Sequence, residues 1–210
     1  MVPAETGGGD DSLATQPADT EPPVVAAILL AAGTSSRFDG ANKLLVPVDG
    51  TPIVRHAGRT LEAAPVEPVV AVLGHDADAV GDALAGLDLE TVTNPAYGDG
   101  QSTSVRCGLE AIPEQADAVM IALGDMPFVD PASITALVDA YRAGAGDALA
   151  AANNSERGNP VLFDRQYFSA LAALEGDIGG RAILEREGAL VETGDPGVRR
   201  DVDRRVDIQE

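Results

Sequence analysis

Short, continuously apolar runs are the feature that most constrains the fold of this chain. Three of them, at residues 24–30, 69–73 and 118–123, contain no charged residue and each has the length of one strand. An apolar run without polar alternation indicates a strand covered on both faces, as in a parallel sheet. Amphipathic stretches separate these runs. The alternation of strand and helix predicts an α/β fold with a mostly parallel central sheet.

Turn and cap signals predict the other elements. Thr51 and Pro52 indicate a helix start, with Thr51 as N-cap and Pro52 in the first helical position. Asp130 before Pro131 indicates a second N-cap. Further helices are expected at residues 76–85, 102–112, 131–143, 165–174 and 179–187, and further strands at 89–93, 147–152, 160–163, around 191 and at 198–202.

Composition sets the domain organisation and excludes several partners. Residues 1–23 are rich in Gly, Pro, Asp and Thr, which predicts a disordered acidic tail before one domain at residues 24–210. The chain has 34 acidic and 14 basic residues, a net charge of −20, and Lys43 is its sole lysine. Such a surface repels phosphate backbones, so neither nucleic acids nor anionic membranes are expected partners. The single cysteine, and the absence of a signal peptide or an apolar run of about 20 residues, favour the cytoplasm.

The most informative segment follows the first apolar run. Residues 30–43 read Leu-Ala-Ala-Gly-Thr-Ser-Ser-Arg-Phe-Asp-Gly-Ala-Asn-Lys. Small residues let backbone N–H groups approach a phosphate, and Arg37 and Lys43 add two cations. The pattern is neither a Walker A loop nor Gly-x-Gly-x-x-Gly, and a plain strand-to-helix turn with two solvated bases is the alternative. The segment therefore predicts a polyphosphate cradle at the carboxyl end of the first strand.

Two aspartates are candidates for holding a metal ion. Asp125 follows the run at residues 118–123 in the string Gly-Asp-Met-Pro, where a strand is expected to end. Asp203, in a late Asp-Val-Asp segment, is a candidate only through a family resemblance. An anionic nucleotide needs Mg²⁺, which prefers one or two carboxylates together with phosphate oxygens and water. The alternatives are a turn-forming Asp125 and a chance Asp-x-Asp spacing in an acidic chain.

The segment at residues 30–43 and the Gly-Asp-Met-Pro string together resemble the MobA-like NTP transferase family. This family includes molybdenum cofactor cytidylyltransferases and molybdopterin-guanine dinucleotide synthases. The resemblance covers about residues 24–208 and implies a Rossmann-like three-layer α/β/α nucleotidyltransferase fold. It also implies catalytic roles for Arg37 and Lys43 and a Mg²⁺ site at Asp125 and Asp203. Asp39 is a departure, because the family usually has Gly at that place.

Weaker segments extend the resemblance to the nucleobase and the acceptor. The Gly-rich loop at residues 94–106 resembles the family's nucleobase segment, with helix capping as the alternative. Residues 157–163 and 176–181 resemble acceptor-side segments, although Asn159 stands where relatives have His. The implied nucleotide contacts are Leu30, Ala31, Ala32, Gly33, Ser35, Asn94, Gly100 and Ser104, and the implied acceptor contacts are Gly158, Pro160, Asp177 and Arg181.

The expected function is Mg²⁺-dependent transfer of a nucleotidyl group from an NTP to a phosphorylated acceptor, with release of pyrophosphate. Ala-Ala-Gly at residues 31–33, rather than Ala-Gly-Gly, favours CTP over GTP. The resemblance implies molybdenum cofactor as acceptor and a molybdoenzyme apoprotein as a further partner. A sugar phosphate or another small phosphorylated alcohol is the alternative acceptor. A non-catalytic nucleotide-binding protein or cofactor chaperone is the alternative of another class.

The acidic, lysine-poor composition predicts a halophilic protein. Salt shortens the Debye length to about 3 Å at about 1 M, which removes most of the self-repulsion of a chain at −20. We expect the melting temperature to rise between about 0.1 M and about 3 M KCl in thermal melts. An unchanged melting temperature across that range would contradict the prediction.

Overall fold

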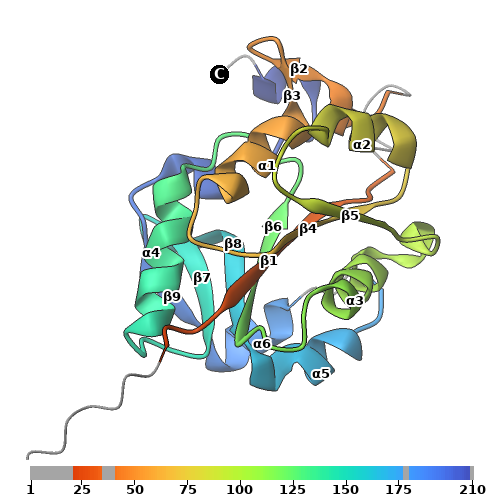
Figure 1. The fold of residues 1–210 in the computed structure, drawn as a ribbon. Helices are drawn as coiled ribbons and strands as arrows, with labels where there is room; N and C mark the ends of the chain where they lie inside the picture. Colours follow the sequence, from red (N-terminus) through yellow and green to blue (C-terminus); the bar gives the residue numbers. More distant parts are fainter. Residues whose placement is uncertain (1–20, 35–40, 177–179, 209–210) are drawn as a thin grey trace, which may run out of the picture.

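The computed structural model describes residues 21–34, 41–176 and 180–208. Within these residues, seven strands form one sheet in the order β5-β4-β1-β6-β8-β7-β9 (Figure 1). In the described part of the sheet, β8 alone runs antiparallel to its neighbours. The strands are β1 Val25–Ala31, β4 Val69–Leu73, β5 Glu90–Thr93, β6 Ala118–Leu123, β7 Ala148–Asn153, β8 Glu156–Asp164 and β9 Ala189–Glu192. The mostly parallel sheet predicted from the apolar runs is confirmed.

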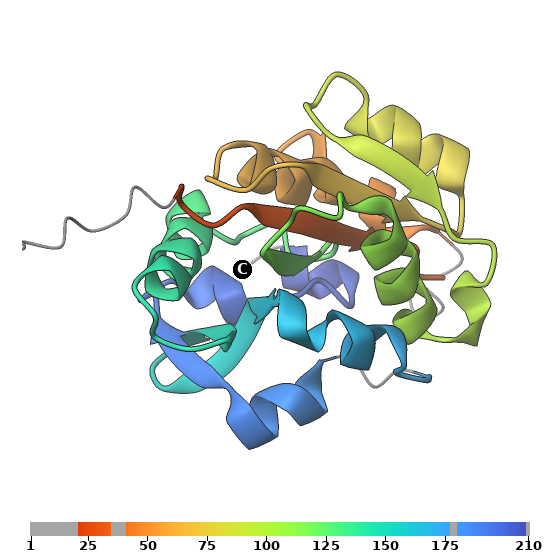
Figure 2. The ribbon, with the colours of Figure 1, turned by 60° about the horizontal axis from the view of Figure 1, so that its bottom comes forward.

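Helices cover both faces of the sheet (Figure 2). Helices α1, α2 and α4 pack on one face, and α3, α5 and α6 pack on the other. Their bounds are α1 Ile53–Glu62, α2 Ala77–Leu84, α3 Gln101–Ala111, α4 Pro131–Arg142, α5 Phe168–Ala172 and α6 Arg181–Glu187. Short 3₁₀ turns lie at η1 Lys43–Leu45, η2 Tyr97–Asp99, η3 Arg165–Tyr167, η4 Pro196–Arg199 and η5 Arg205–Ile208. The predicted three-layer α/β/α arrangement is confirmed.

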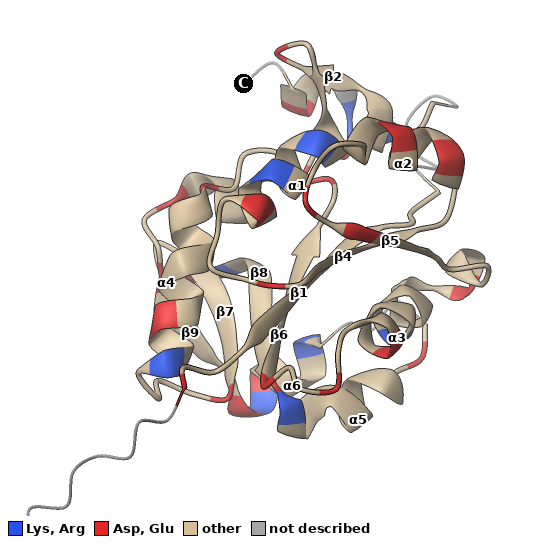
Figure 3. Ribbon diagram, in the orientation of Figure 1, with Lys and Arg blue, Asp and Glu red and all other residues tan. Residues whose placement is uncertain are grey.

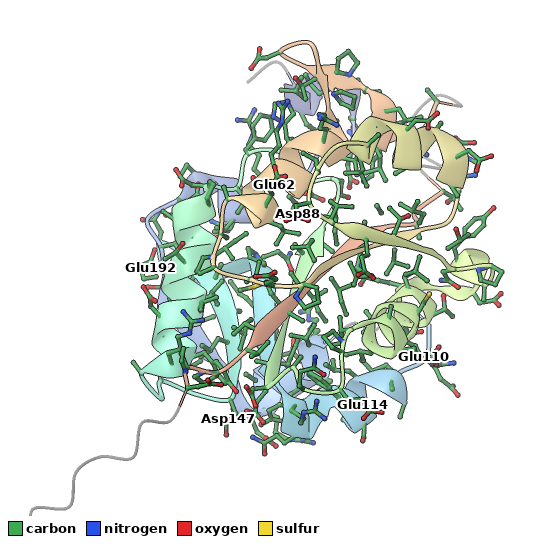
Figure 4. All side chains as sticks on the ribbon, in the orientation of Figure 1. Glu62, Asp88, Glu110, Glu114, Asp147 and Glu192 are labelled. Atoms are coloured by element: carbon green, nitrogen blue, oxygen red, sulfur yellow. The ribbon has the colours of Figure 1, made fainter. Side chains whose placement is uncertain are left out.

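Strand β1 shows why the central strands are uniformly apolar. Val25, Ala27 and Leu29 pack toward α1, and Ala26 and Ile28 pack toward α3. All five side chains are buried. Figure 3 accordingly shows β1 and β6 without charged residues, and the six acidic residues labelled in Figure 4 are all exposed. No helix in the described part of the chain combines the length and apolar character needed to cross a bilayer.

The strand order reverses direction at β1. This strand pairs in parallel with β4 on one side and with β6 on the other, and the chain reaches β6 only after β5 and α3. In open α/β sheets such a switch point leaves a crevice beyond the carboxyl ends of the two strands, where ligands bind. The first predicted loop and Asp125 both lie at this crevice.

Two local predictions were wrong. Thr51 does not cap a helix, because Thr51–Pro52 forms a small hairpin as β3 with β2, Pro47–Val48. Asp49 and Gly50 between them both have positive φ, 49° and 77°, which is the turn chemistry of a two-residue hairpin. Residues 198–202 do not form a strand: the Asp195 carboxylate accepts a hydrogen bond from the Gly197 N–H at 2.7 Å and opens η4 instead. The Asp130 cap is confirmed, since its carboxylate accepts from the Ala132 N–H at 2.8 Å.

The close packing of α3 on β1 gives a stability prediction. An added Cβ at Gly108 would lie 2.6 Å from Ile28 Cγ2, whereas one at Gly81 of α2 would lie 3.4 Å from Leu73 Cδ1. We expect Gly108→Ala to lower the free energy of unfolding by about 1–3 kcal/mol through overpacking. The matched control Gly81→Ala should raise it by up to about 1 kcal/mol through helix propensity. Urea unfolding measures both, and equal effects would contradict the packing argument.

Candidate functional site

A cleft of about 350 Å³ opens beyond the carboxyl ends of β1 and β6. Its walls come from the loop after β1, from η1, from the segment that joins η2 to α3, and from the turn after β6. The predicted site residues that line it are Leu30, Ala32, Gly33, Lys43, Gly100, Ser104 and Asp125. These residues come from three separate segments of the sequence, and tertiary folding brings them together in one cleft.

Lys43 lies between two carboxylates in this cleft. Its Nζ donates to Asp125 Oδ2 at 2.6 Å and to Asp203 Oδ1 at 3.0 Å. The Lys43 side chain is 16% exposed, that of Asp125 21% and that of Asp203 45%, so solvent is excluded more from the Asp125 pair than from the Asp203 pair. Burial acts to lower the pKa of Lys43, but the two carboxylates outweigh burial and raise this pKa above its ordinary value. The ammonium is therefore firmly charged at the site where an anionic ligand would enter.

Local structure explains how Lys43 and Asp203 reach each other. The Asn42 carboxamide oxygen accepts from the Leu44 N–H at 3.1 Å and caps η1, which fixes the direction of Lys43. The C-terminal segment is tied to the end of β6, because the Val202 N–H donates to the Asp125 carbonyl oxygen at 2.9 Å. Val202 itself is fully buried, which anchors the neighbouring Asp203 at the cleft.

A third carboxylate, Asp201, joins the predicted metal candidates. Carboxylate oxygens of Asp125, Asp201 and Asp203 all lie within 4.8 Å of one another. Burial, reinforced by the charges of Asp203 and Asp125, raises the pKa of Asp201. Asp201 was not among the metal ligands predicted from the sequence. The Asp-Val-Asp spacing could have indicated it, because residues two apart in an extended segment lie on the same side. Asp201 would then be expected beside Asp203.

The acidic cluster offers a buried oxygen that could bind a divalent cation. Among the described residues, Asp125 Oδ1 is buried and has no hydrogen-bond partner, while Oδ2 of the same carboxylate receives Lys43. A buried acceptor without a partner costs about 1–3 kcal/mol, so it calls for an explanation such as an ion. Oxygen donors alone form the cluster, which suits hard cations such as Mg²⁺ and Mn²⁺.

The Gly-rich loop forms the opposite wall of the cleft. Gly100 precedes α3 with φ of 111°, and any Cβ there would come within 2.6 Å of the Gly176 backbone. Asn94 is buried, and its Nδ2 donates to Ser104 Oγ at 3.0 Å and to Thr103 Oγ1 at 2.9 Å. Asn94 does not line the cleft described above; it positions Ser104, which does. The N-terminal turn of α3 thereby faces the cleft with Gln101 and Ser104.

Gly33, in the described part of the loop after β1, lines the cleft without close packing contacts. A Cβ on Gly33 would meet no atom within 4 Å among the described residues, so packing in the described part does not require glycine there. Ala31 is buried at the end of β1 and contributes to the core. Ser35, Arg37 and Asp39 lie outside the described residues.

The predicted acceptor residues separate onto two sides of the sheet. Gly158 and Arg181 line a second cavity of about 270 Å³, which shares Leu30, Gln101 and Leu123 with the cleft. Pro160 instead lines a narrow apolar space beneath α1 and α4. Asp177 lies outside the described residues. The structure therefore brings Gly158 and Arg181, but not Pro160, to the cavity that adjoins the cleft.

Comparison with known proteins identifies the family. Residues 27–192 match the MobA-like NTP transferase domain. The chain belongs to the MobA-like NTP transferase family. The resemblance inferred from residues 30–43 and the Gly-Asp-Met-Pro string is thus confirmed.

Two curated proteins illustrate the range of relatives. The bifunctional protein GlmU of Kineococcus radiotolerans is 39% identical over 135 residues, which is 62% of this chain and 27% of that protein. The nicotine blue oxidoreductase of Paenarthrobacter nicotinovorans is 31% identical over 83% of this chain and 88% of that protein. This MobA-like chain therefore spans about a quarter of the GlmU relative but most of the oxidoreductase.

Solved structures support the same fold. Rv0371c from Mycobacterium tuberculosis superposes with a TM-score of 0.73 at 27% identity, over 89% of this chain and 96% of that one. A structure of Rv0371c in complex with manganese superposes with a TM-score of 0.71 at 26% identity, over 89% and 96% of the two chains. A nucleotidyl transferase from Methanothermobacter has a TM-score of 0.76 at 24% identity, covering 89% and 94%.

Competition between Lys43 and a metal ion gives a prediction for this MobA-like site. Without nucleotide, the Lys43 ammonium already pairs with Asp125 and Asp203, so a divalent cation at the same carboxylates would meet its positive charge. We expect Lys43→Met to bind Mn²⁺ about tenfold more tightly than wild type, a difference of about 1.4 kcal/mol. We expect Asp125→Asn to bind it more weakly than wild type. Titration of free Mn²⁺ by electron paramagnetic resonance measures these affinities.

The control for this titration is Arg186→Met. Arg186 lies on α6, is 72% exposed and pairs with Glu187, so the substitution removes one positive charge away from the cleft. Equal Mn²⁺ affinities for Lys43→Met and Arg186→Met would contradict the competition, because general electrostatic attraction would then account for both.

Proposed function

We propose that this chain catalyses transfer of a nucleotidyl group from an NTP to a phosphorylated acceptor, with release of pyrophosphate. The observation that carries the proposal is the Lys43 ammonium held between Asp125 and Asp203 in the cleft beyond β1 and β6. A positively charged group beside a carboxylate cluster suits a ligand that brings both phosphate oxygens and a metal ion. Family membership supports the same class of reaction.

The triphosphate is proposed to lie against the loop after β1. The open space at Gly33 lets phosphate oxygens approach the backbone closely. On the opposite wall, the first turn of α3 begins at Gln101, and a helix N-terminus favours negative charge. Ser35 and Arg37 are proposed to complete the cradle on the basis of the family motif. Lys43 would then stabilise the charge that develops on the phosphates during attack by the acceptor.

Mg²⁺ is the proposed cofactor, with Asp125 and Asp203 as its ligands. The buried Oδ1 of Asp125 supports this choice, because it needs a partner that the described residues do not provide. When bound, the ion would neutralise phosphate charge and help to align the α-phosphate with the acceptor. Asp201 lies near enough to hold the ion through water or to add negative charge to the site.

CTP is the proposed donor and molybdenum cofactor the proposed acceptor, with GTP and sugar phosphates as alternatives. The Ala-Ala-Gly sequence at residues 31–33 and the family resemblance support the first pair. The bifunctional protein GlmU is a relative over only part of its length, so it supports nucleotidyl transfer more than any particular acceptor. A molybdoenzyme apoprotein remains a proposed partner of the product.

Pyrophosphate release tests the proposal and the role of Lys43 together. The purified chain, with Mg²⁺, is assayed with CTP and GTP, each against molybdenum cofactor and a set of sugar phosphates. We expect one combination to release pyrophosphate and Lys43→Ala to reduce its turnover by more than about tenfold, since losing a preorganised charge contact costs about 3 kcal/mol.

Arg186→Ala is the control for this assay. It removes one exposed positive charge on α6 and should leave turnover unchanged. Near-normal turnover of Lys43→Ala would contradict the assignment of Lys43. Nucleotide binding without pyrophosphate in any combination would favour a non-catalytic nucleotide-binding protein or cofactor chaperone.

A second candidate function follows from the relative that matches over most of its length. That protein is named an oxidoreductase, and 88% of it aligns with this chain. The cleft would then hold a hydride carrier such as a nicotinamide dinucleotide, whose diphosphate makes similar demands on the loop after β1. Oxidation of NADH or NADPH by a dye substrate, without pyrophosphate release from NTPs, would favour this function over transfer.

A further inference from the structure

We propose that Arg157 and Arg181 form an anion site in the second cavity and that this site selects an acceptor with an anionic group remote from its reacting phosphate. The inference rests on the proposed function, because it treats the second cavity as the acceptor's place. Arg157 begins the segment at residues 157–163 that resembles an acceptor-side motif, but it is not among the acceptor contacts that the resemblance implies. The described structure brings it to the same cavity as Arg181, which comes from a different segment. The chemical class proposed is a small molecule with an apolar body and two separate anionic groups.

The second cavity is placed to hold a molecule that reacts in the first. Its volume is about 270 Å³, and it meets the cleft at Leu30, Gln101 and Leu123. Lys43 and Asp125 line the cleft only, and the two arginines line the cavity only. An acceptor that lies in the cavity and presents its reacting oxygen to the cleft therefore places a different part of itself beside the arginines.

Apolar side chains form much of the cavity wall between these ends. Val105 comes from α3, Ile121 from β6, Val161 from β8 and Leu184 from α6. Such a wall favours an apolar body, because burying polar hydroxyl groups there without hydrogen bonds would cost free energy. Gln101, Asn159 and the two arginines also line the cavity, so the apolar body is expected against the four apolar side chains and the polar groups of the acceptor elsewhere.

The arginines concentrate positive charge on a chain of net charge −20. Arg181 Nε donates to Glu185 Oε1 at 2.7 Å, and both side chains are exposed. Arg181 lowers the pKa of Glu185, and Arg157 contributes to the same lowering, which places the three groups in one electrostatic cluster. Two positive charges against one negative charge leave this cluster net positive, so it attracts an anion.

Backbone packing holds both arginines in place. The backbone of Gly158, next to Arg157, lies against the Val198 carbonyl oxygen with no space for a side chain. Gly180, next to Arg181, packs in the same way against the ring of Phe163. Packing therefore fixes the backbone positions from which the two exposed side chains extend.

Binding of 1-naphthyl phosphate tests the anion site without requiring catalysis. The compound has an aromatic body and one phosphate, and its fluorescence is easily read because the chain has no tryptophan. In the presence of saturating Mg²⁺ and a non-hydrolysable CTP analogue, we expect Arg157→Gln and Arg181→Gln each to weaken its binding by about tenfold or more. Arg186→Gln, which changes the same charge on α6 outside the cavity, should bind it like wild type.

Three results would overturn the inference. They are equal binding by Arg157→Gln and wild type, an equal loss in Arg186→Gln, and binding of 1-naphthol as tight as that of its phosphate. The assay also separates this inference from the proposed function. If both arginines contribute to binding of the probe but no pyrophosphate is released, the anion site stands and its role in nucleotidyl transfer is contradicted. If Arg157→Gln releases pyrophosphate with the KM of wild type for the acceptor, nucleotidyl transfer is supported. The proposal that the anion site selects the acceptor is then contradicted.

Discussion

Burial of the central sheet on both faces is the constraint on which the rest of the structure depends. Strands β1, β4 and β6 contact helices on each side, so a polar side chain within them would lose its hydration at a cost of about 1–3 kcal/mol unless it found a partner. Functional groups are therefore confined to the strand ends. The Gly124 N–H donates to the Leu30 carbonyl oxygen at 2.9 Å, which places the ends of β1 and β6 side by side.

An acidic protein that binds anionic ligands must arrange its few positive charges locally. Most acidic residues in the described part of the chain lie at exposed positions, where salt and water screen their charge. Lys43, in contrast, is mostly buried. It pairs with Asp125 and Asp203, which lie 82 and 160 positions later in the sequence. Its charge therefore acts over a short range in a region of low dielectric constant. Net charge excludes extended polyanions as ligands, but it does not exclude a compact triphosphate.

The accuracy of the sequence analysis depended on how local each signal was. The apolar runs predicted β4 and β6 at their observed bounds and β1 to within one residue. The errors at Thr51 and at residues 198–202 arose where short polar side chains and Gly, at residues 49–50 and 195–197, create turns that outweigh strand and helix propensity. Asp201 was not predicted: its spacing from Asp203 is visible in the sequence, but the proximity of both residues to Asp125 depends on the path of the distant C-terminal segment.

The sequence by itself determined the fold class, the family motif and the chemistry available at each strand end. These properties follow from hydrophobic periodicity and from residue types at short spacing, which are local in the chain. Only the tertiary structure decided that Lys43 lies between Asp125 and Asp203, that Asp201 joins them, and that Pro160 faces away from Gly158 and Arg181. The physical reason is that these relations depend on strand order and on the path of the C-terminal segment, which are set by packing of the whole chain.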